Sequence, residues 1–243
     1  MKLTLIGIGT GNPDHLTRQA MRAMQSAGLI LLPRKGESKA DLADLRRAIL
    51  ADVAPHTPIA EFDLPIRDES IADYTTRVNA WHDAIANVWA QTIAQHRADH
   101  VALLIWGDPA LYDSTLRIAA RLSPAPQITV VPAVTSITAM TAAHAIALND
   151  IGAPFTVTTG RQLREGGFPA GVNTAVVMLD GENSFATLPP EGITIYWTAY
   201  AGMENEISLS GPLTELGPKI TEARRNARTA HGWIMDIYLL RRG

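Results

Sequence analysis

The chain has 243 residues, of which 47% are hydrophobic and 19% are charged, and its formal net charge is −3 at pH 7. This composition suits one or two folded domains and argues against a disordered or fibrous protein, while the slightly acidic balance argues against nucleic acid as a partner. The chain contains no cysteine, which excludes disulfides and thiolate metal sites, and it shows no signal peptide or membrane span, so we expect a cytoplasmic protein without a membrane partner.

The first segments alternate between strand-like and helix-like patterns. An apolar run over residues 3–8 ends in glycines, and a helix follows it with Thr17 as N-cap and Gly28 as C-cap. A second short strand is expected over residues 29–32, closed by Pro33. This order predicts the start of a parallel α/β domain.

The middle of the chain continues the alternation. Helices are expected over residues 38–53, 70–95 and 137–148, and buried strands over 101–106 and 128–131. The helix over 70–95 carries a stripe at helical spacing that favours a core-facing side over a coiled-coil seam. The stripe consists of Ile71, Tyr74, Val78, Trp81, Ile85, Val88 and Thr92.

The chain becomes richer in strands after Asn149. Five strands are expected, over residues 155–159, 174–179, 193–198, 206–210 and 233–240, with one helix over 215–228. The predicted fold class is therefore α/β with two domains, residues 1–149 and 150–243. The first should hold a mainly parallel sheet and the second a mixed one.

The first candidate site is the loop Gly7-Ile8-Gly9-Thr10-Gly11, which follows a strand and precedes a helix. Its spacing is not that of a dinucleotide fingerprint, and the second strand lacks the following acidic residue that would bind a ribose. A site for NADP with Arg34 on the extra phosphate stays open, as does a tight turn without a ligand. There is no Walker-type motif, so nucleotide hydrolysis is not indicated.

Two further loops follow buried strands. Trp106-Gly107-Asp108-Pro109-Ala110-Leu111-Tyr112 comes after one strand, and Pro132-Ala133-Val134-Thr135-Ser136 after the next. The carboxyl ends of such strands are where open α/β sheets bind ligands. Taken singly, the first loop is also a good turn and the second a simple helix cap.

The three loops together, in this order, resemble those of the tetrapyrrole methylases. The resemblance extends over the whole chain, because residues 176–180 and 209–213 are similar to the family's later strands. It implies two α/β domains that hold S-adenosylmethionine (SAM) between them, no metal, a tetrapyrrole substrate and a homodimer. The family's SAM contacts fall on Thr10, Trp106, Gly107, Asp108, Leu111, Thr135, Ser136, Leu179 and Ala201.

The sequence departs from the family at three positions. Much of the family has Pro at the position of Thr10 and Met at the position of Leu179. Methylases that act on uroporphyrinogen carry an Asp proton acceptor where this chain has Pro33, which argues against that substrate and against assigning that catalytic role here.

Methyl transfer from a sulfonium needs mainly that the acceptor carbon be held in line with the methyl group. No residue is therefore assigned as catalytic, although Asp14 and Asp108 lie in loops from which a base could act. The carboxylates of a tetrapyrrole would need cations, and the candidates are Arg34, Lys35, Arg161 and Arg164. Besides a corrin-precursor methyltransferase, a nicotinamide oxidoreductase and a non-catalytic tetrapyrrole-binding protein remain as alternatives.

Overall fold

A computed structural model describes residues 1–34 and 40–243, with the side chains of residues 40–43 left out. The chain divides into two compact units, Met1–Val134 and Thr135–Gly243. This division precedes the boundary expected near residue 149, because helix α5 (Ser136–Ala143) contacts strands of the second unit. Lys35 and the expected start of a helix at Ser38 lie outside the described residues.

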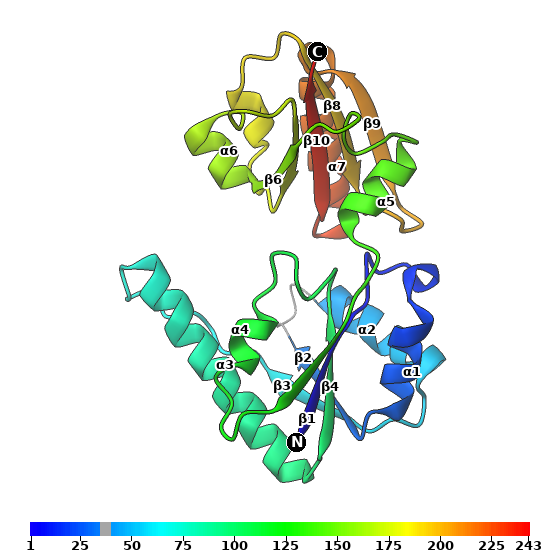
Figure 1. Cartoon of the computed structure of the whole chain (residues 1–243), viewed down its shortest axis with the longest axis vertical. Helices are drawn as coiled ribbons and strands as arrows, with labels where there is room; N and C mark the ends of the chain where they lie inside the picture. Colours follow the sequence, from blue (N-terminus) through cyan, green and yellow to red (C-terminus); the bar gives the residue numbers. More distant parts are fainter. Residues whose placement is uncertain (35–39) are drawn as a thin grey trace. The chain divides into compact units, whose positions relative to one another are not determined.

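The first unit is built on a five-stranded sheet with the order β3-β2-β4-β1-β5 (Figure 1). All neighbouring strands in it run parallel. The strands are β1 (Lys2–Gly7), β2 (Leu29–Arg34), β3 (Ile59–Asp63), β4 (His100–Ile105) and β5 (Gln127–Val131). The parallel sheet predicted for the amino-terminal part is therefore confirmed.

Helices cover both faces of this sheet, as Figure 1 shows. One face packs against α1 (Arg18–Ser26) and α2 (Ala40–Val53), and the other against α3 (Tyr74–His96) and α4 (Thr115–Ala119). Because both faces are covered, the inner strands β1, β2 and β4 are almost continuously apolar and buried, whereas the edge strands β3 and β5 are largely exposed.

Local chemistry explains the bounds of the early elements. Thr17 is the N-cap of α1 as predicted, and its side chain accepts a hydrogen bond from the backbone N–H of Ala20. The helix ends at Ala27 rather than at Gly28. Strand β2 continues through Pro33, because a proline without an N–H can still be the partner of Phe62 on the neighbouring strand.

Helix α3 is a core-facing helix, but its buried face differs from the predicted stripe. Ile85 and Thr92 are buried as expected, whereas Tyr74 is exposed because the helix begins there rather than at residue 70. The buried positions are His82, Ile85, Ala86, Trp89, Thr92 and Ile93. Over part of the helix, the predicted stripe is therefore about one residue out of phase with the buried face.

The second unit contains a mixed five-stranded sheet with the order β6-β7-β10-β8-β9. Strands β6 and β7 are parallel, and the other pairs are antiparallel. The strands are β6 (Phe155–Thr159), β7 (Thr174–Met178), β8 (Ile193–Ala199), β9 (Ile207–Pro212) and β10 (Asp236–Arg242). The mixed sheet expected for the carboxyl-terminal part is confirmed.

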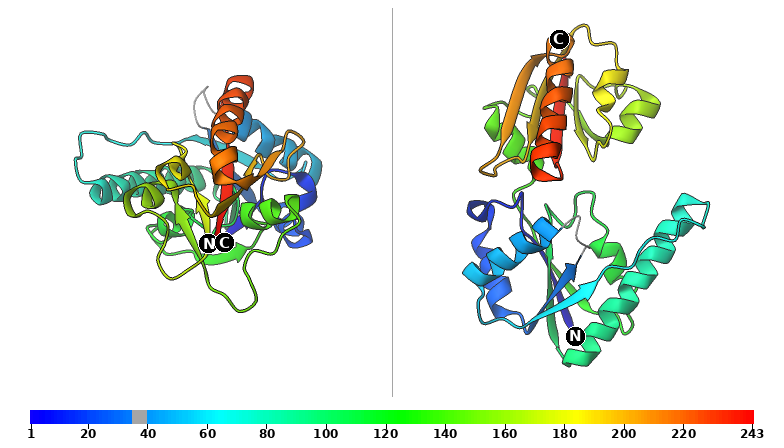
Figure 2. Two further views of the ribbon diagram at one scale, coloured as in Figure 1. Left: turned by 90° about the horizontal axis from the view of Figure 1, so that it is seen from above. Right: turned by 180° about the vertical axis from the view of Figure 1, so that it is seen from behind.

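Helix α7 (Leu213–His231) packs on one face of this sheet together with α6 (Gly160–Gly166) and the short 3-10 helix η3 (Ser184–Thr187). Helix α5 lies on the other face, as the two opposite views in Figure 1 and the right panel of Figure 2 show. Within the described part of the chain, no helix is both long and apolar enough to cross a bilayer.

Candidate active site

The three candidate loops of the first unit follow strands that are neighbours in the sheet. Strand β1 lies between β4 and β5, and all three run in the same direction. The loops after Gly7, Ile105 and Val131 therefore leave the same carboxyl edge of the sheet, where parallel α/β sheets place their ligand sites.

The first two loops are joined by a pair of backbone hydrogen bonds between glycines. The N–H of Gly9 donates to the carbonyl of Gly107 at 3.2 Å, and the N–H of Gly107 donates to the carbonyl of Gly9 at 2.9 Å. Both residues have positive φ, 69° and 73°, which explains why glycine occupies them. The two loops thus form one backbone structure.

Asp108 joins this structure to the third loop. One carboxylate oxygen accepts a hydrogen bond from the N–H of Ala110 at 2.8 Å, and the other accepts one from the N–H of Ala133 at 2.9 Å. The carbonyl of Asp108 accepts from the N–H of Leu111 at 3.1 Å and closes the turn. Asp108 therefore holds the loops together, and both of its oxygens are already engaged.

Close packing reinforces this junction. A Cβ atom added at Gly7 would lie 2.7 Å from the Cβ of Ala133 and 2.9 Å from the carbonyl oxygen of Gly107. At Gly107 the situation is reversed, because no heavy atom of the described residues lies within 4 Å of an added Cβ. The backbone of Gly107 thus faces open space into which a ligand can approach.

The side chains of Thr10 and Trp106 turn toward the protein. Thr10 is buried, and its hydroxyl is 2.9 Å from Nδ1 of His15. An added Cβ at Gly11 would be 2.8 Å from the Trp106 ring, on which the guanidinium of Arg46 lies 5.8 Å from the centroid. Any ligand of this edge would therefore meet the backbone of both residues more than their side chains.

Arg46 is a buried cation beneath this edge. Its Nε donates to the carbonyl of Leu104 at 3.3 Å. Burial lowers the pKa of Arg46, although the carboxylate of Asp113 opposes that shift. The residue thus supports the end of β4 directly below the Gly107 loop.

Four expected contacts belong to the second unit, and the structure shows their local roles. Thr135 caps α5, since its hydroxyl accepts from the N–H of Thr138 at 3.3 Å, and Ser136 is the first residue of that helix. Leu179 follows β7 and Ala201 follows β8. Because both strands run antiparallel to β10, their carboxyl ends share one edge of the sheet.

This edge contains two unusual backbone positions. Leu179 has φ 54° and is 66% exposed, and Tyr200 has φ 52° beside the buried Ala201. Non-glycine residues in this region carry strain that surrounding structure must hold, and such positions gather at functional sites. The strained positions therefore mark the same edge that the sequence resemblance assigned to SAM.

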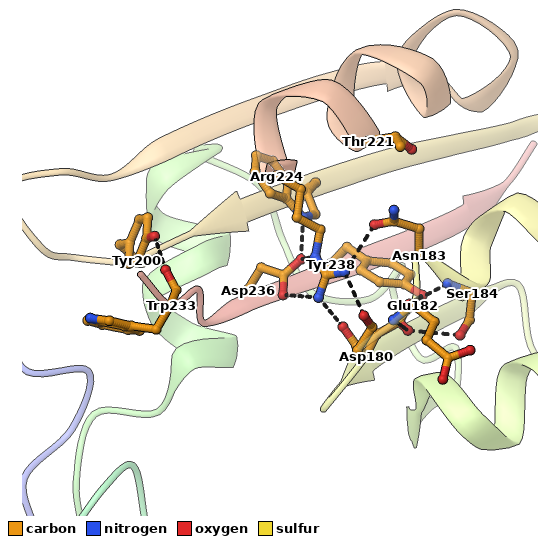
Figure 3. Close-up of polar contacts among 12 residues, drawn as sticks. Asp180, Glu182, Asn183, Ser184, Tyr200, Thr221, Arg224, Trp233, Asp236 and Tyr238 are labelled. Atoms are coloured by element: carbon orange, nitrogen blue, oxygen red, sulfur yellow. Dashed lines mark hydrogen bonds and ion pairs between the residues drawn. The ribbon is translucent and has the colours of Figure 1, made fainter. Parts of the chain in front are cut away.

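Tyr200 is held by hydrogen bonds to the segment before β10. Its N–H donates to the carbonyl of Met235 at 2.8 Å, and its hydroxyl donates to the carbonyl of Trp233 at 2.6 Å (Figure 3). The rings of Tyr200 and Trp233 meet edge to face at 5.2 Å. These contacts fix the turn that carries Ala201.

The loop after Leu179 is held by a buried ion pair, drawn in Figure 3. Nε of Arg224 lies 2.8 Å from Oδ2 of Asp236, and both side chains are less than a tenth exposed. The same guanidinium donates to the carbonyls of Asp180 and Gly181, the latter at 3.0 Å. Arg224 thus connects α7 to the start of β10 and to the loop after β7.

The carboxylate of Asp180 completes this network. Burial alone would raise its pKa, but hydrogen bonds from Tyr238 at 2.6 Å and from Ser184 at 2.8 Å outweigh burial and lower the pKa. The pKa of the Tyr238 phenol is raised by burial and by this carboxylate. Every group of the network is paired, so its role is to hold the edge rather than to react.

The network was missed in the sequence, although a signal for it exists. Leu213, Ile220 and Ala227 are buried on one side of α7, and Arg224 is in phase with them. A charged residue on the apolar face of a helix indicates a buried partner. Asp236 could not be identified as that partner, because its strand was predicted to begin three residues earlier.

The cations expected to meet substrate carboxylates are partly engaged. Arg34 forms two hydrogen bonds of 2.9 Å to Asp63, and Arg164 lies 3.3 Å from Glu182. Arg161 also has an interaction within the protein. An extra phosphate of NADP would have to displace Asp63 from Arg34.

Comparison with known proteins identifies the family of this architecture. The family model of the tetrapyrrole (corrin/porphyrin) methylases matches residues 2–217. A precorrin-6A synthase (deacetylating) from a Sinorhizobium species is 42% identical over 250 aligned positions, which cover 100% of this chain and 95% of that protein. A precorrin-2 C(20)-methyltransferase from Sinorhizobium is 30% identical over 54% of each chain.

Solved structures agree with this result. A cobalamin-synthesis-related protein from Corynebacterium diphtheriae has a TM-score of 0.84 and 38% identity, covering 99% of this chain and 98% of that chain. A uroporphyrin-III C-methyltransferase from Thermus thermophilus, solved with S-adenosylhomocysteine, has a TM-score of 0.63 and 20% identity, covering 99% and 92% of the two chains. At 20% identity, the similarity to the Thermus thermophilus enzyme shows a shared fold only.

Proposed function

The chain belongs to the tetrapyrrole methylases, and from this premise we propose that it is a precorrin-6A synthase of cobalamin biosynthesis. It would transfer a methyl group from SAM to C-1 of precorrin-5 and release the acetyl group as acetate. The observation that carries the proposal is the 42% identity to a precorrin-6A synthase over the full length of this chain. The opening stretch at residues 6–13 and the segment 230–238 also resemble precorrin-6A synthases.

One observation in the first unit supports SAM as the ligand. Beside the hydrogen-bonded pair of glycine loops, no heavy atom of the described residues lies within 4 Å of a Cβ added at Gly107, so a ligand could approach the backbone there. When bound, SAM supplies a methyl group activated by its sulfonium. We propose as its contacts Thr10, Trp106, Gly107, Asp108, Leu111, Thr135, Ser136, Leu179 and Ala201.

The residues proposed to hold SAM act by positioning. Asp108 and the paired glycines fix the backbone of the proposed contacts in the first unit. In the second unit, Arg224 and Tyr200 fix the strained turns that carry Leu179 and Ala201. A rigid backbone keeps donor and acceptor in a reactive arrangement, which supplies most of the rate in such transfers. No metal is part of this proposal.

Two alternatives have weaker support. A methyltransferase acting at another precorrin carbon is favoured by the relative that methylates C-20 of precorrin-2, but that similarity covers 54% of this chain. A nicotinamide oxidoreductase would need the first glycine loop to bind a dinucleotide, and Arg34 is already paired with Asp63. A protein that binds the pigment without methylating it is distinguished by the absence of SAM turnover.

We also propose that the enzyme is a cytoplasmic homodimer that binds neither nucleic acid nor membranes. Light scattering coupled to gel filtration would give a mass twice the 26.2 kDa of one chain. A mass of one chain at micromolar concentration would contradict the dimer and leave the proposed reaction untouched.

The proposed function is tested in two steps. Calorimetric titration with S-adenosylhomocysteine should show micromolar binding at one site per chain, corresponding to about −8 kcal/mol. Incubation with SAM and precorrin-5 should then release one acetate per methyl group transferred. Methyl transfer without acetate would point to another precorrin carbon, and failure of folded protein to bind S-adenosylhomocysteine would overturn the assignment.

A further inference from the structure

Four polar side chains of the second unit form a continuous hydrogen-bonded chain on the α5 side of the sheet. Nε2 of His144 is 3.0 Å from the hydroxyl of Thr198, which is 3.1 Å from the hydroxyl of Ser208. The hydroxyl of Ser208 donates to Oε1 of Glu206 at 3.2 Å. His144 is the C-cap of α5, and the other three residues come from β8, β9 and the turn between them.

The proton positions along this chain follow from its acidic end. An ionised carboxylate only accepts, so the Ser208 proton points to Glu206. The remaining lone pairs of Ser208 must then accept the Thr198 proton, and Thr198 in turn accepts from Nε2–H of His144. Nε2 also lies 3.2 Å from the carbonyl oxygen of Trp197, which can only accept a hydrogen bond. That carbonyl and the hydrogen-bonded side chains together select the tautomer of His144 that carries its proton on Nε2 and a lone pair on Nδ1.

The Nδ1 atom of His144 is available to a reactant. No described residue hydrogen-bonds to it, and it is not among the buried polar atoms without a partner, so it lies within reach of water. Burial lowers the pKa of His144, although the carbonyl of Trp197 and the charge of Glu206 oppose the shift. The imidazole is therefore neutral at pH 7 and can accept a proton.

The charged and titratable groups around His144 come from three elements. Tyr196 of β8 meets the imidazole edge to face at 5.5 Å. Arg241 of β10 lies 5.9 Å from the Tyr196 ring centroid and donates to the carbonyls of Ala147 and Leu148. Glu206 is the acidic group among the four hydrogen-bonded side chains. Its negative charge would therefore stabilise a proton taken up at Nδ1 of His144, through the hydroxyls of Thr198 and Ser208.

The series of hydrogen-bonded side chains ends at Glu206, next to the edge that we propose to bind the cofactor. Oε2 of Glu206 accepts a hydrogen bond of 2.6 Å from the N–H of Gly202, directly after Ala201. Thr198 is the second-last residue of β8, which ends at Ala199. These four hydrogen-bonded side chains are thus connected to the turn that we propose to contact SAM.

We propose that His144 is the general base that activates water for acetate release, with Thr198, Ser208 and Glu206 as its positioning residues. This inference rests on the proposed function. Nδ1 takes a proton from water as the oxygen bonds to the acetyl carbonyl carbon. The bond between that carbon and C-1 then breaks, acetic acid leaves and ionises, and the electron pair of that bond stays at C-1. This pair forms the bond to the methyl group as the methyl–sulfur bond of SAM breaks and S-adenosylhomocysteine leaves, and His144 releases its proton to water.

The two carboxylates named from the sequence are less suited to this role. Both oxygens of Asp108 accept backbone hydrogen bonds that hold loops together. Asp14 is an exposed residue of a single-turn 3-10 helix, and among the described residues its carboxylate has no partner that would orient it for a proton transfer. His144 alone among these candidates combines a free basic nitrogen with a partner that fixes its other nitrogen.

The test compares His144→Gln with His56→Gln, an exposed histidine in the first unit. Acetate release from precorrin-5 should fall about 10²–10⁴-fold in the first variant and stay unchanged in the second. The affinity for S-adenosylhomocysteine should be unchanged in both, which separates loss of a base from a disturbed fold. The wild-type profile of kcat/KM against pH should have an acidic limb that His144→Gln lacks.

A second readout needs no substrate. Nitrogen NMR of the free protein should show His144 protonated on Nε2 in the wild type and in Ser210→Ala. Ser208→Ala removes the link between Thr198 and Glu206 and should slow acetate release, whereas the carbonyl of Trp197 should keep the proton on Nε2. Full acetate release by His144→Gln, or a proton on Nδ1 in the wild type, would overturn the inference alone. Absence of acetate from the wild type would overturn the proposed function.

Discussion

Gly107 gives a direct test of the proposed cofactor site at the level of a single residue. Its φ of 73° is matched by that of Gly152, 67°, and neither has a described heavy atom within 4 Å of an added Cβ. Gly107→Ala and Gly152→Ala therefore introduce the same backbone strain, about 1–2 kcal/mol. We expect only Gly107→Ala to weaken S-adenosylhomocysteine binding, by about tenfold or more, since its methyl group enters the ligand's space.

Titration calorimetry on both variants decides this prediction. Circular dichroism should confirm that each is folded before the comparison is made. Equal affinities in Gly107→Ala, Gly152→Ala and the wild type would remove the Gly107 loop from the proposed site.

Asp108 should behave as a structural link more than as a ligand. In Asp108→Asn an amide nitrogen replaces one of the two oxygens, and a donor then faces the N–H of either Ala110 or Ala133. The loss of a charged acceptor should reduce the free energy of unfolding by about 1–3 kcal/mol. The loops should separate as a result, and the affinity for S-adenosylhomocysteine should fall.

Urea denaturation measures this effect, with Asp68→Asn as the control. Asp68 also accepts two hydrogen bonds, but both come from Ser70 within its own exposed turn. If Asp108→Asn and Asp68→Asn have the same stability and the same ligand affinity, then the link between the loops contributes nothing.

The sequence located these loops but not the roles of their side chains. Glycines that directly follow two buried strands indicate a ligand edge, and Gly9 and Gly107 do lie together there. That Asp108 would bind Ala133 was not predictable, because the pairing depends on how closely the strand ends approach in space. The series of hydrogen-bonded side chains from His144 joins residues of α5, β8 and β9, and such a contact has no local sequence pattern.

At the level of elements, the buried ion pair of Arg224 and Asp236 should be the polar contact that stabilises the second unit most. Arg224→Met leaves the Asp236 carboxylate buried without its charge partner and frees the carbonyls of Asp180 and Gly181. Breaking such a pair from one side costs about 3–5 kcal/mol. We expect α7 and β10 to loosen together with the loop that carries Leu179.

The neighbouring residue gives a matched control. Arg225 is exposed and lies 4.0 Å from Glu222, so Arg225→Met should change the free energy of unfolding by less than about 1 kcal/mol. Urea denaturation of both variants measures the difference between them. A loss below about 1 kcal/mol in Arg224→Met would show that the ion pair does not stabilise the second unit in this way.

Element prediction succeeded where periodicity was strong and failed where burial was decided by distant partners. Strands β4 and β5 contain continuous apolar runs, and their predicted bounds agree with the structure within a residue. The expected burial holds for β4 only, because β5 lies at the edge of the sheet and four of its five residues are exposed. Strand β3 was missed, because at this edge of the sheet its alternating residues include the charged Glu61 and Asp63. Helix α6 was missed because its seven residues contain two glycines, and tertiary packing of Leu163 stabilises it.

For the molecule as a whole, stability should depend on pH in two stages. Burial holds the pKa values of His82 and His144 below their ordinary value, and nearby arginines add to the effect at His82. In the unfolded chain these residues titrate near about 6.5. As the pH falls below that value, the unfolded chain binds protons that the folded chain does not, so stability decreases by at most about 1.4 kcal/mol per pH unit for each proton.

The second stage should come from carboxylates whose pKa values are lowered in the fold. A hydrogen bond from Arg47 is the main cause for Glu61, and bonds from Tyr238 and Ser184 overcome burial for Asp180. Their stabilisation is present above the unfolded pKa values near about 4 and is lost as the pH falls through the folded values. The histidine stage therefore precedes the carboxylate stage when acid is added.

Urea denaturation between pH 7.5 and pH 4.5 isolates the first stage. His82 is 2% exposed and neither ring nitrogen has a partner among the described residues, so its protonation in the folded state is opposed most strongly. His82→Leu should flatten the decline between about pH 6.5 and pH 5, whereas the exposed His56→Gln should leave it unchanged. Stability of the wild type that stays constant over this interval would mean that the folded protein takes up these protons freely, and that the interior around His82 is open to water.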